Sequence, residues 1–156
     1  MLSNKKAFTL IELLVVVLII GILAAVAVPQ YQVAVGKSKL VRLFPIMRAI
    51  RQAEIVYHLS TGDYIDDFES LDIQMPGGKL EGGSNKHYDY NGFSCYFHNT
   101  DSLYCVQSGL PKLEIYWAEE SFVCWAAEDD LLTHKMCRAL TGKTTADVGT
   151  TGYFIN

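Results

Sequence analysis

The strongest constraint on this chain is a run of twenty-one residues, 8–28, in which Glu12 is the only ionisable side chain. A helix needs about 20 residues to cross the hydrocarbon core of a bilayer, which is roughly 30 Å thick. A carboxylate inside such a helix costs on the order of 2–3 kcal/mol, so an acidic residue there is a functional candidate. We therefore predict a membrane-spanning helix over 8–28 in which Glu12 has a function. The alternative is that Glu12 merely lies at the level of the lipid headgroups.

A motif surrounds the start of this run. Its residues are Lys5-Lys6-Ala7 and then Phe8-Thr9-Leu10-Ile11-Glu12, with Pro29 and Tyr31 further along. They resemble the type IV pilin-like family, which includes the type IV pilins and the pseudopilins of type II secretion. The resemblance is close over 4–36, loose over the next thirty residues, and a matter of general layout beyond. Ala7 departs from the family pattern, which usually has Gly at that position.

The resemblance implies a processing event at the start of the apolar run. Residues 1–7 would be a leader, which a prepilin peptidase removes by cutting between Ala7 and Phe8. The new amine of Phe8 would then be N-methylated. The implied fate is a single pass through the bacterial inner membrane, with the head outside the cytoplasm, followed by incorporation into an extracellular or periplasmic filament.

The resemblance also implies how such a subunit assembles. The family places Glu12, Phe8 and Pro29 in the assembling helix, and Glu12 would pair with the methylated amine of Phe8 on a neighbouring subunit. The implied partners are copies of this chain, other pilin-like subunits, the prepilin peptidase, the inner membrane and the assembly platform. The implied function is that of a structural subunit of a type IV pilus-like filament, and a type II secretion pseudopilin is the alternative within the family.

An ordinary secretory signal is a different interpretation of the same residues. Such a signal has a basic start, an apolar stretch of about 7–15 residues and an A-x-A-like cleavage site. Ala25-Val26-Ala27 supplies such a site, and cleavage there would release a soluble exported binding domain that begins at Val28. The apolar run is longer than this pattern requires, and it contains Glu12, so we favour the filament interpretation.

The composition disfavours two further classes of function. The net charge is −4, from 13 basic and 17 acidic residues, and loss of Lys5 and Lys6 with the leader would make it −6. A nucleic-acid-binding protein usually carries a basic stripe, which is missing here, so we expect no nucleic-acid partner. Catalytic motifs such as a nucleophile elbow, a P-loop or HExxH are also missing. We therefore expect neither an enzyme nor a cofactor.

All four cysteines lie in the last 62 residues of the chain: Cys95, Cys105, Cys124 and Cys137. An even count in an exported domain indicates two disulfides, and four cysteines allow three pairings. We favour Cys95–Cys105 and Cys124–Cys137, because each pair closes a short local loop. The alternative is a two-Cys, two-His zinc site, with Cys95 and His98 as one pair of ligands and His134 and Cys137 as the other. In the resembled family, type IV pilins commonly carry a C-terminal disulfide loop like Cys124–Cys137.

An amphipathic helix pattern continues beyond the membrane run, over 29–62. Gly62 supplies a stop signal at its end. Pro29 and Gly36 are expected points of bending or local unwinding. Pro45 is expected to kink the helix, or to break it with the helix resuming at once, because proline inside a helix costs about 3 kcal/mol.

The rest of the chain, 63–156, is predicted to form a globular head. It comprises a connector over 63–90, a sheet over 91–127, a disulfide-bounded region over 124–137 and a tail over 138–156. Four antiparallel strands are predicted in the sheet, with one face on the amphipathic helix, which gives an α+β fold. Acidic residues in the connector suggest a calcium site, but they lack the loop spacing of one, so no metal is expected. These residues are Asp63, Asp66, Asp67, Glu69 and Asp72.

The junction between Ala7 and Phe8 leads to the first testable prediction. Intact-mass analysis of the exported protein should show a chain that starts at N-methylated Phe8. A chain that starts at Met1 would show that the leader is retained, and a chain that starts at Val28 would show ordinary signal cleavage. Either result would contradict the filament interpretation.

Overall fold

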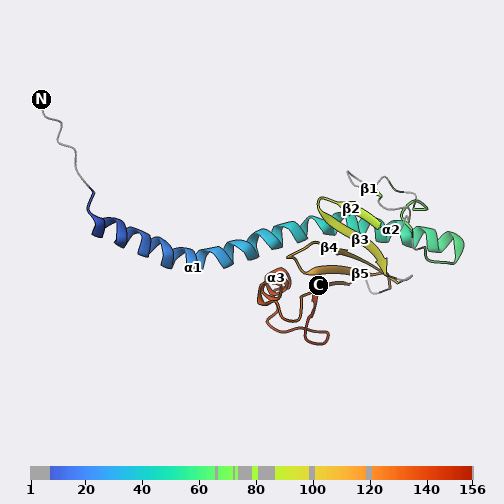
Figure 1. The fold of residues 1–156 in the computed structure, drawn as a ribbon. Helices are drawn as coiled ribbons and strands as arrows, with labels where there is room; N and C mark the ends of the chain where they lie inside the picture. The colour runs from blue at the N-terminus through green and yellow to red at the C-terminus, as the bar shows by residue number, and fades with distance from the viewer. Residues whose placement is uncertain are drawn as a thin grey trace, which may run out of the picture. The chain divides into compact units, whose positions relative to one another are not determined.

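The computed structural model describes residues 8–65, 67–71, 73, 79–80, 87–98, 101–118 and 121–155. The chain divides into two compact units, a first unit of residues 1–32 and a second unit of residues 33–156, and the division falls inside the first helix. Within these described residues, three helices and seven strands are assigned. Figure 1 draws the long first helix and the sheet of the second unit. The α+β fold with two disulfides, predicted from the sequence, is confirmed.

The first helix, α1 (Leu10–Val41), contains 32 residues and continues through Pro29. The unwinding expected at Pro29 and Gly36 does not occur, because the backbone remains helical at both positions. Gly36 is buried, and a Cβ at this position would lie 2.5 Å from the Sδ atom of Met136. This glycine therefore serves the close approach of a distant side chain rather than the unwinding of the helix.

The break expected at Pro45 is present, and the helix resumes at once. The second helix, α2 (Leu43–Thr61), begins two residues after α1 ends, and Pro45 is its third residue. A proline within the first turn removes no intrahelical hydrogen bond, because the first N–H groups of a helix have no acceptor within it. At its other end, Gly62 adopts φ 87° and donates its N–H to the His58 carbonyl at 2.8 Å. The predicted stop signal is confirmed.

All seven strands form one antiparallel sheet in which each strand pairs with the next along the chain. The strands are β1 (Lys79–Leu80), β2 (His87–Tyr90), β3 (Phe93–His98), β4 (Ser102–Val106), β5 (Lys112–Tyr116), β6 (Phe122–Trp125) and β7 (Gly152–Ile155). The four strands predicted from the sequence correspond to β3–β6. β1 and β2 lie in the segment that the sequence predicts as a connector, and β7 lies in the predicted tail, so the sheet extends beyond the predicted strands at both edges.

The core of the second unit lies between α2 and one face of this sheet (Figure 1). Leu43, Met47 and Ile50 of the helix are fully buried, and so are Leu103 and Leu113 of the facing strands. Burial of a leucine-sized side chain stabilises the folded state by about 1.5–3 kcal/mol. These side chains fix the amphipathic helix against the sheet.

A third helix, α3 (Leu131–Thr141), lies between β6 and β7 in the chain and begins within the disulfide-bounded region 124–137. The Asp130 side chain caps it by accepting a hydrogen bond from the Leu132 N–H at 2.9 Å. Such a cap contributes about 1 kcal/mol. Met136, one turn into this helix, is the side chain that lies close to Gly36.

Both disulfides have the pairing that the short loops favoured. Cys95–Cys105 joins two residues that face each other across β3 and β4, with a Cα–Cα distance of 4.0 Å. Cys124–Cys137 joins β6 to α3, with a Cα–Cα distance of 5.6 Å. A closed loop of about 15 residues contributes roughly 3 kcal/mol in the chain-entropy model. The second disulfide thus fixes α3 to the sheet.

A buried carboxylate links the central strands. Glu114 of β5 is 1% exposed, and it accepts hydrogen bonds from Lys112 at 3.0 Å and Ser102 at 3.1 Å, while its Oε1 lies 3.0 Å from the Nδ1 of His98. Burial acts to raise the pKa of Glu114, but the bonds from Lys112, His98 and Ser102 outweigh it and hold the pKa below its usual 4.5. The carboxylate is therefore charged in the folded protein and stabilises it.

We expect Glu114→Gln to lower the free energy of unfolding at pH 7 by about 1–3 kcal/mol, because hydrogen bonds to a charged group are lost. Since the folded pKa is lowered, this stabilisation is present above pH 4.5 and is lost as the pH falls through the folded pKa. The difference in the free energy of unfolding between wild type and variant should therefore become smaller below pH 4.5. Urea unfolding at several pH values measures it. Asp101→Asn, at an exposed position, serves as control. If the difference between wild type and Glu114→Gln stays the same at low pH, the prediction is contradicted.

Candidate functional site

The start of α1 carries a reciprocal set of hydrogen bonds between two polar residues. The N–H of Thr9 donates to the Oε2 of Glu12 at 2.8 Å, and the Thr9 hydroxyl donates to the same oxygen at 2.6 Å. In return, the N–H of Glu12 donates to the Thr9 hydroxyl at 3.3 Å. This arrangement is a capping box, in which two N–H groups at a helix start, otherwise without acceptors, are satisfied.

The capping box gives Glu12 a structural function besides the function in assembly that the resemblance implies. The sequence carries a signal for it, because a Ser or Thr followed three residues later by Glu is the signature of a capping box. All the hydrogen bonds that Glu12 accepts go to Oε2, and its other oxygen accepts none from the described residues. An ionised carboxylate has lone pairs for about four bonds. Glu12 can therefore cap its own helix and still bind a further donor.

The remainder of the first unit is an apolar surface that its own chain does not cover. Phe8 is 75% exposed, and none of the most apolar window of the helical stretch Leu10–Thr61 is buried within the protein. By length and composition this stretch is the one candidate membrane span in the described part of the chain, although a signal sequence near an N-terminus would pass the same test. The exposed large side chains include Leu10, Ile11, Leu13, Leu14, Leu18, Ile20, Ile22, Leu23 and Val26.

The structure places the predicted site residues in two separate groups. Phe8, Glu12 and Pro29 belong to the first unit, where Pro29 lies inside α1, and Ala7 lies outside the described residues. The four cysteines all belong to the second unit, where they form the two disulfides. The candidate site for assembly is therefore the start of α1, and the cysteines stabilise a different part of the chain.

The two metal alternatives find no support in the described geometry. All four cysteines are in disulfides, so none is available as a thiolate ligand for zinc. His98 faces Glu114, and His134 lies with its Nδ1 2.9 Å from the hydroxyl of Tyr153. Of the acidic connector, Asp66 and Asp72 lie outside the described residues. Across the residues that the structure does describe, no group of three or more His, Cys, Asp or Glu side chains is arranged to hold a metal ion.

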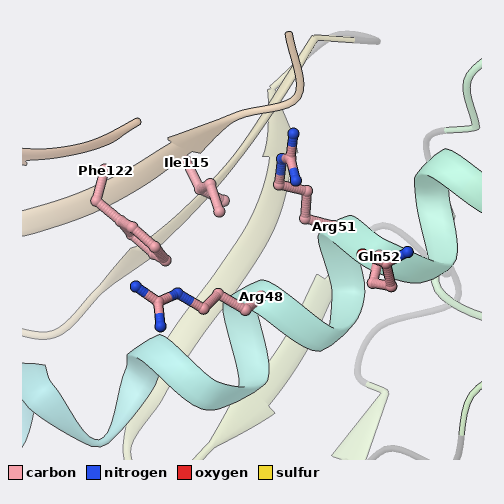
Figure 2. Close-up of a pocket in the computed structure, with 5 residues that line it drawn as sticks. All are labelled: Arg48, Arg51, Gln52, Ile115 and Phe122. Carbon is pink, nitrogen blue, oxygen red and sulfur yellow. The ribbon is translucent and has the colours of Figure 1, made fainter. Parts of the chain in front are cut away.

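A second feature of possible functional interest is a basic hollow of about 290 Å³ between α2 and the strands β5 and β6 (Figure 2). The hollow is lined by Arg48, Arg51, Gln52, Ile115 and Phe122. Arg48 lies 5.5 Å from the centroid of the Phe122 ring, and Arg51 donates to the Trp117 carbonyl at 2.7 Å. No local pattern in the sequence marks this hollow, because its residues come from two distant segments.

Comparison with known proteins identifies related sequences. Residues 2–28 match the family model for the prokaryotic N-terminal methylation motif. The chain is 33% identical over 78 residues to the type IV major pilin protein PilE1 of Neisseria gonorrhoeae, a match that covers 50% of this chain and 47% of the relative. It is 51% identical over 53 residues to the type IV major fimbrial protein FimA of Dichelobacter nodosus, over 34% of each chain.

A third relative is a fimbrial protein of Pseudomonas aeruginosa, which is 49% identical over 80 residues, or 51% of this chain and 52% of the relative. The chain thus spans about half the length, or less, of the curated relatives that it matches. These matches support the type IV pilin-like resemblance that the motif at 4–36 indicated.

The capping box can be tested at Thr9. Thr9→Val keeps the shape of the side chain but removes the hydroxyl, so the start of α1 should lose about 1 kcal/mol, which corresponds to roughly fivefold faster exchange of the Glu12 amide. Hydrogen exchange followed by NMR in detergent micelles measures this rate. Thr9→Ser keeps the hydroxyl and should exchange like wild type. Equal rates in the valine and serine variants would show that the capping box is not formed.

Proposed function

We propose that this type IV pilin-like chain is a structural subunit of a type IV pilus-like filament, held in the inner membrane by the first half of α1 and assembled through the same segment. The observation that carries this proposal is an apolar half-helix, uncovered by its own chain, with one carboxylate at its start. The related proteins named as pilins and fimbrial proteins support it, and they do not favour the pseudopilin alternative.

In the membrane state, the apolar side chains of α1 lie in lipid. Every backbone N–H and C=O within the hydrocarbon must be bonded inside the protein, because no water is available there. The capping box satisfies two N–H groups at the helix start, those of Thr9 and Glu12. The bonds from Thr9 also solvate the carboxylate, which lowers the cost of holding Glu12 near the membrane.

During assembly, the same apolar surface would leave the lipid and pack against copies of itself. Helices associate in such surroundings by close packing and by polar pairs, because lipid is as apolar as leucine. The amine of Phe8 on a neighbouring subunit would bind the open Oε1 of Glu12. A wrong stagger would leave a buried charge without its partner, which is strongly unfavourable. Glu12 would therefore set the register between neighbours.

Further partners follow from this proposal. A prepilin peptidase would cut between Ala7 and Phe8, and an assembly platform in the inner membrane would extract the subunit. Cleavage after Ala27 is the competing event, and it would cut within the continuous helix α1. The second unit would lie outside the cytoplasm, where its two disulfides are stable. The role is structural rather than enzymatic.

Two substitutions at Glu12 separate its capping function from its charge. Glu12→Ala removes both, whereas Glu12→Gln keeps a side chain that can complete a capping box. We expect both variants to reach the membrane at normal levels, but to lower the yield of sheared filaments at least about tenfold, because a buried amine is left without its partner. The apolar substitution Val16→Ala serves as control.

The yield of the glutamine variant decides the result. Filament yield is measured from sheared cells, alongside the amount of the chain in the membrane fraction. A normal yield from Glu12→Gln would show that the charge has no function in assembly and that Glu12 acts only as a cap. If the wild-type chain, expressed with its export machinery, gives no filaments at all, the proposed function itself is wrong.

A further inference from the structure

The exposed side of α3 carries opposite charges toward its two ends. Leu131, Lys135 and Arg138 are exposed, and their spacing of four and three residues places them on one side of the helix. Glu128 and Asp129 are also exposed and lie in the turn just before the helix begins. The structure describes this segment without a gap, over 121–155. An acidic pair therefore precedes the helix, and two cations follow along its exposed side.

These charges have no partner within their own chain. Neither carboxylate before α3 makes a hydrogen bond or an ion pair with a described residue, and the same holds for the Lys135 ammonium and the Arg138 guanidinium. The neighbouring charges are already engaged, because Asp130 caps α3 and the Lys143 ammonium lies 2.8 Å from the Oδ2 of Asp147. The exposed side of α3 is therefore open to charges on another molecule.

The arrangement is self-complementary about a two-fold axis. Positions 128 and 138, like 131 and 135, are symmetric about position 133. In an antiparallel pair of α3 helices, Glu128 and Asp129 of each copy would therefore meet Arg138 of the other. Leu131 would face Lys135, whose methylene stem can cover an apolar side chain while the ammonium stays in water. A parallel pair would bring like charges together, so the antiparallel pair is favoured.

A contact in which both partners use the same surface is isologous. One filament offers no such contact between its own subunits, because they all point the same way along its axis. Two filaments that run in opposite directions do offer it. The charges on α3 therefore fit a second copy of this chain that belongs to another filament.

We propose that α3 of one copy pairs antiparallel with α3 of a copy in a neighbouring, oppositely directed filament, and so joins filaments side by side. Each contact is a weak surface pairing, but a filament repeats it many times, so that avidity can hold two filaments together. This inference rests on the proposed filament function and names a second contact, separate from the pairing at Glu12.

Charge reversal with complementary mixing tests the contact in cells that express the full chain. Arg138→Glu should lower the fraction of sheared filaments that pellets as bundles at low speed at least about tenfold, because carboxylates then face carboxylates. The double substitution Glu128→Lys with Asp129→Lys should have the same effect. Mixing the two kinds of variant filament should restore bundles, because opposite charges then meet at both ends of each contact. Arg42→Glu makes the same change of charge at an exposed position outside α3 and should leave the bundled fraction unchanged.

Electron microscopy of the same samples counts single filaments and bundles separately. Protection of all four cysteines from alkylation checks that the second unit is folded. A bundled fraction from Arg138→Glu equal to that from Arg42→Glu would overturn the inference, and so would a mixture that bundles no better than its parts. Wild-type filaments that never form bundles would also overturn it and leave the proposed function standing. Absence of wild-type filaments would instead contradict the proposed function.

Discussion

The central constraint on this protein is an apolar half-helix that its own chain leaves uncovered. Leu10 is 77% exposed and Leu23 is 64% exposed, and none of the described residues of the first unit belongs to the buried core. Exposure of such a surface to water is unfavourable, because it costs about 25 cal/mol for each square ångström of apolar area. In the proposed function, lipid would cover this surface in the membrane, and neighbouring copies of the same helix would cover it in the filament. The carboxylate of Glu12 at the helix start would then favour one register between neighbours over the others.

In the second unit, the helical segment after residue 32 packs against the sheet and against α3. The break before Pro45 allows α2 to begin anew, with Leu43 and Met47 fully buried against the sheet. Gly36 allows Met136 to approach the helix closely, and the Cys124–Cys137 disulfide holds α3 to β6. A unit of this size buries a modest core, so the disulfides and the bonds to Glu114 add stability that packing alone would supply in a larger domain.

One part of the sheet outside the predicted strands has a clear signal in the sequence. Asn91 and Gly92 have φ of 51° and 81° and join β2 to β3, which is the two-residue turn that Asn-Gly favours in hairpins. This dipeptide therefore indicates a strand, β2, before the turn. Trp125 of β6 is only partly buried, with the Lys112 ammonium 5.2 Å from its ring centroid. Alternation along β6 places it on the face opposite the buried Cys124.

The sequence by itself determined the features that depend on neighbouring residues. These include the membrane-length run with Glu12, the capping box, the helix break at Pro45 and the two short disulfide loops. Only the tertiary structure decided which distant segments meet. It added β7 to β6, buried Glu114 among His98, Ser102 and Lys112, and placed Arg48 over Phe122. The physical reason is that a local pattern limits the backbone near it, whereas burial and charge pairing depend on partners that the fold brings from elsewhere in the chain.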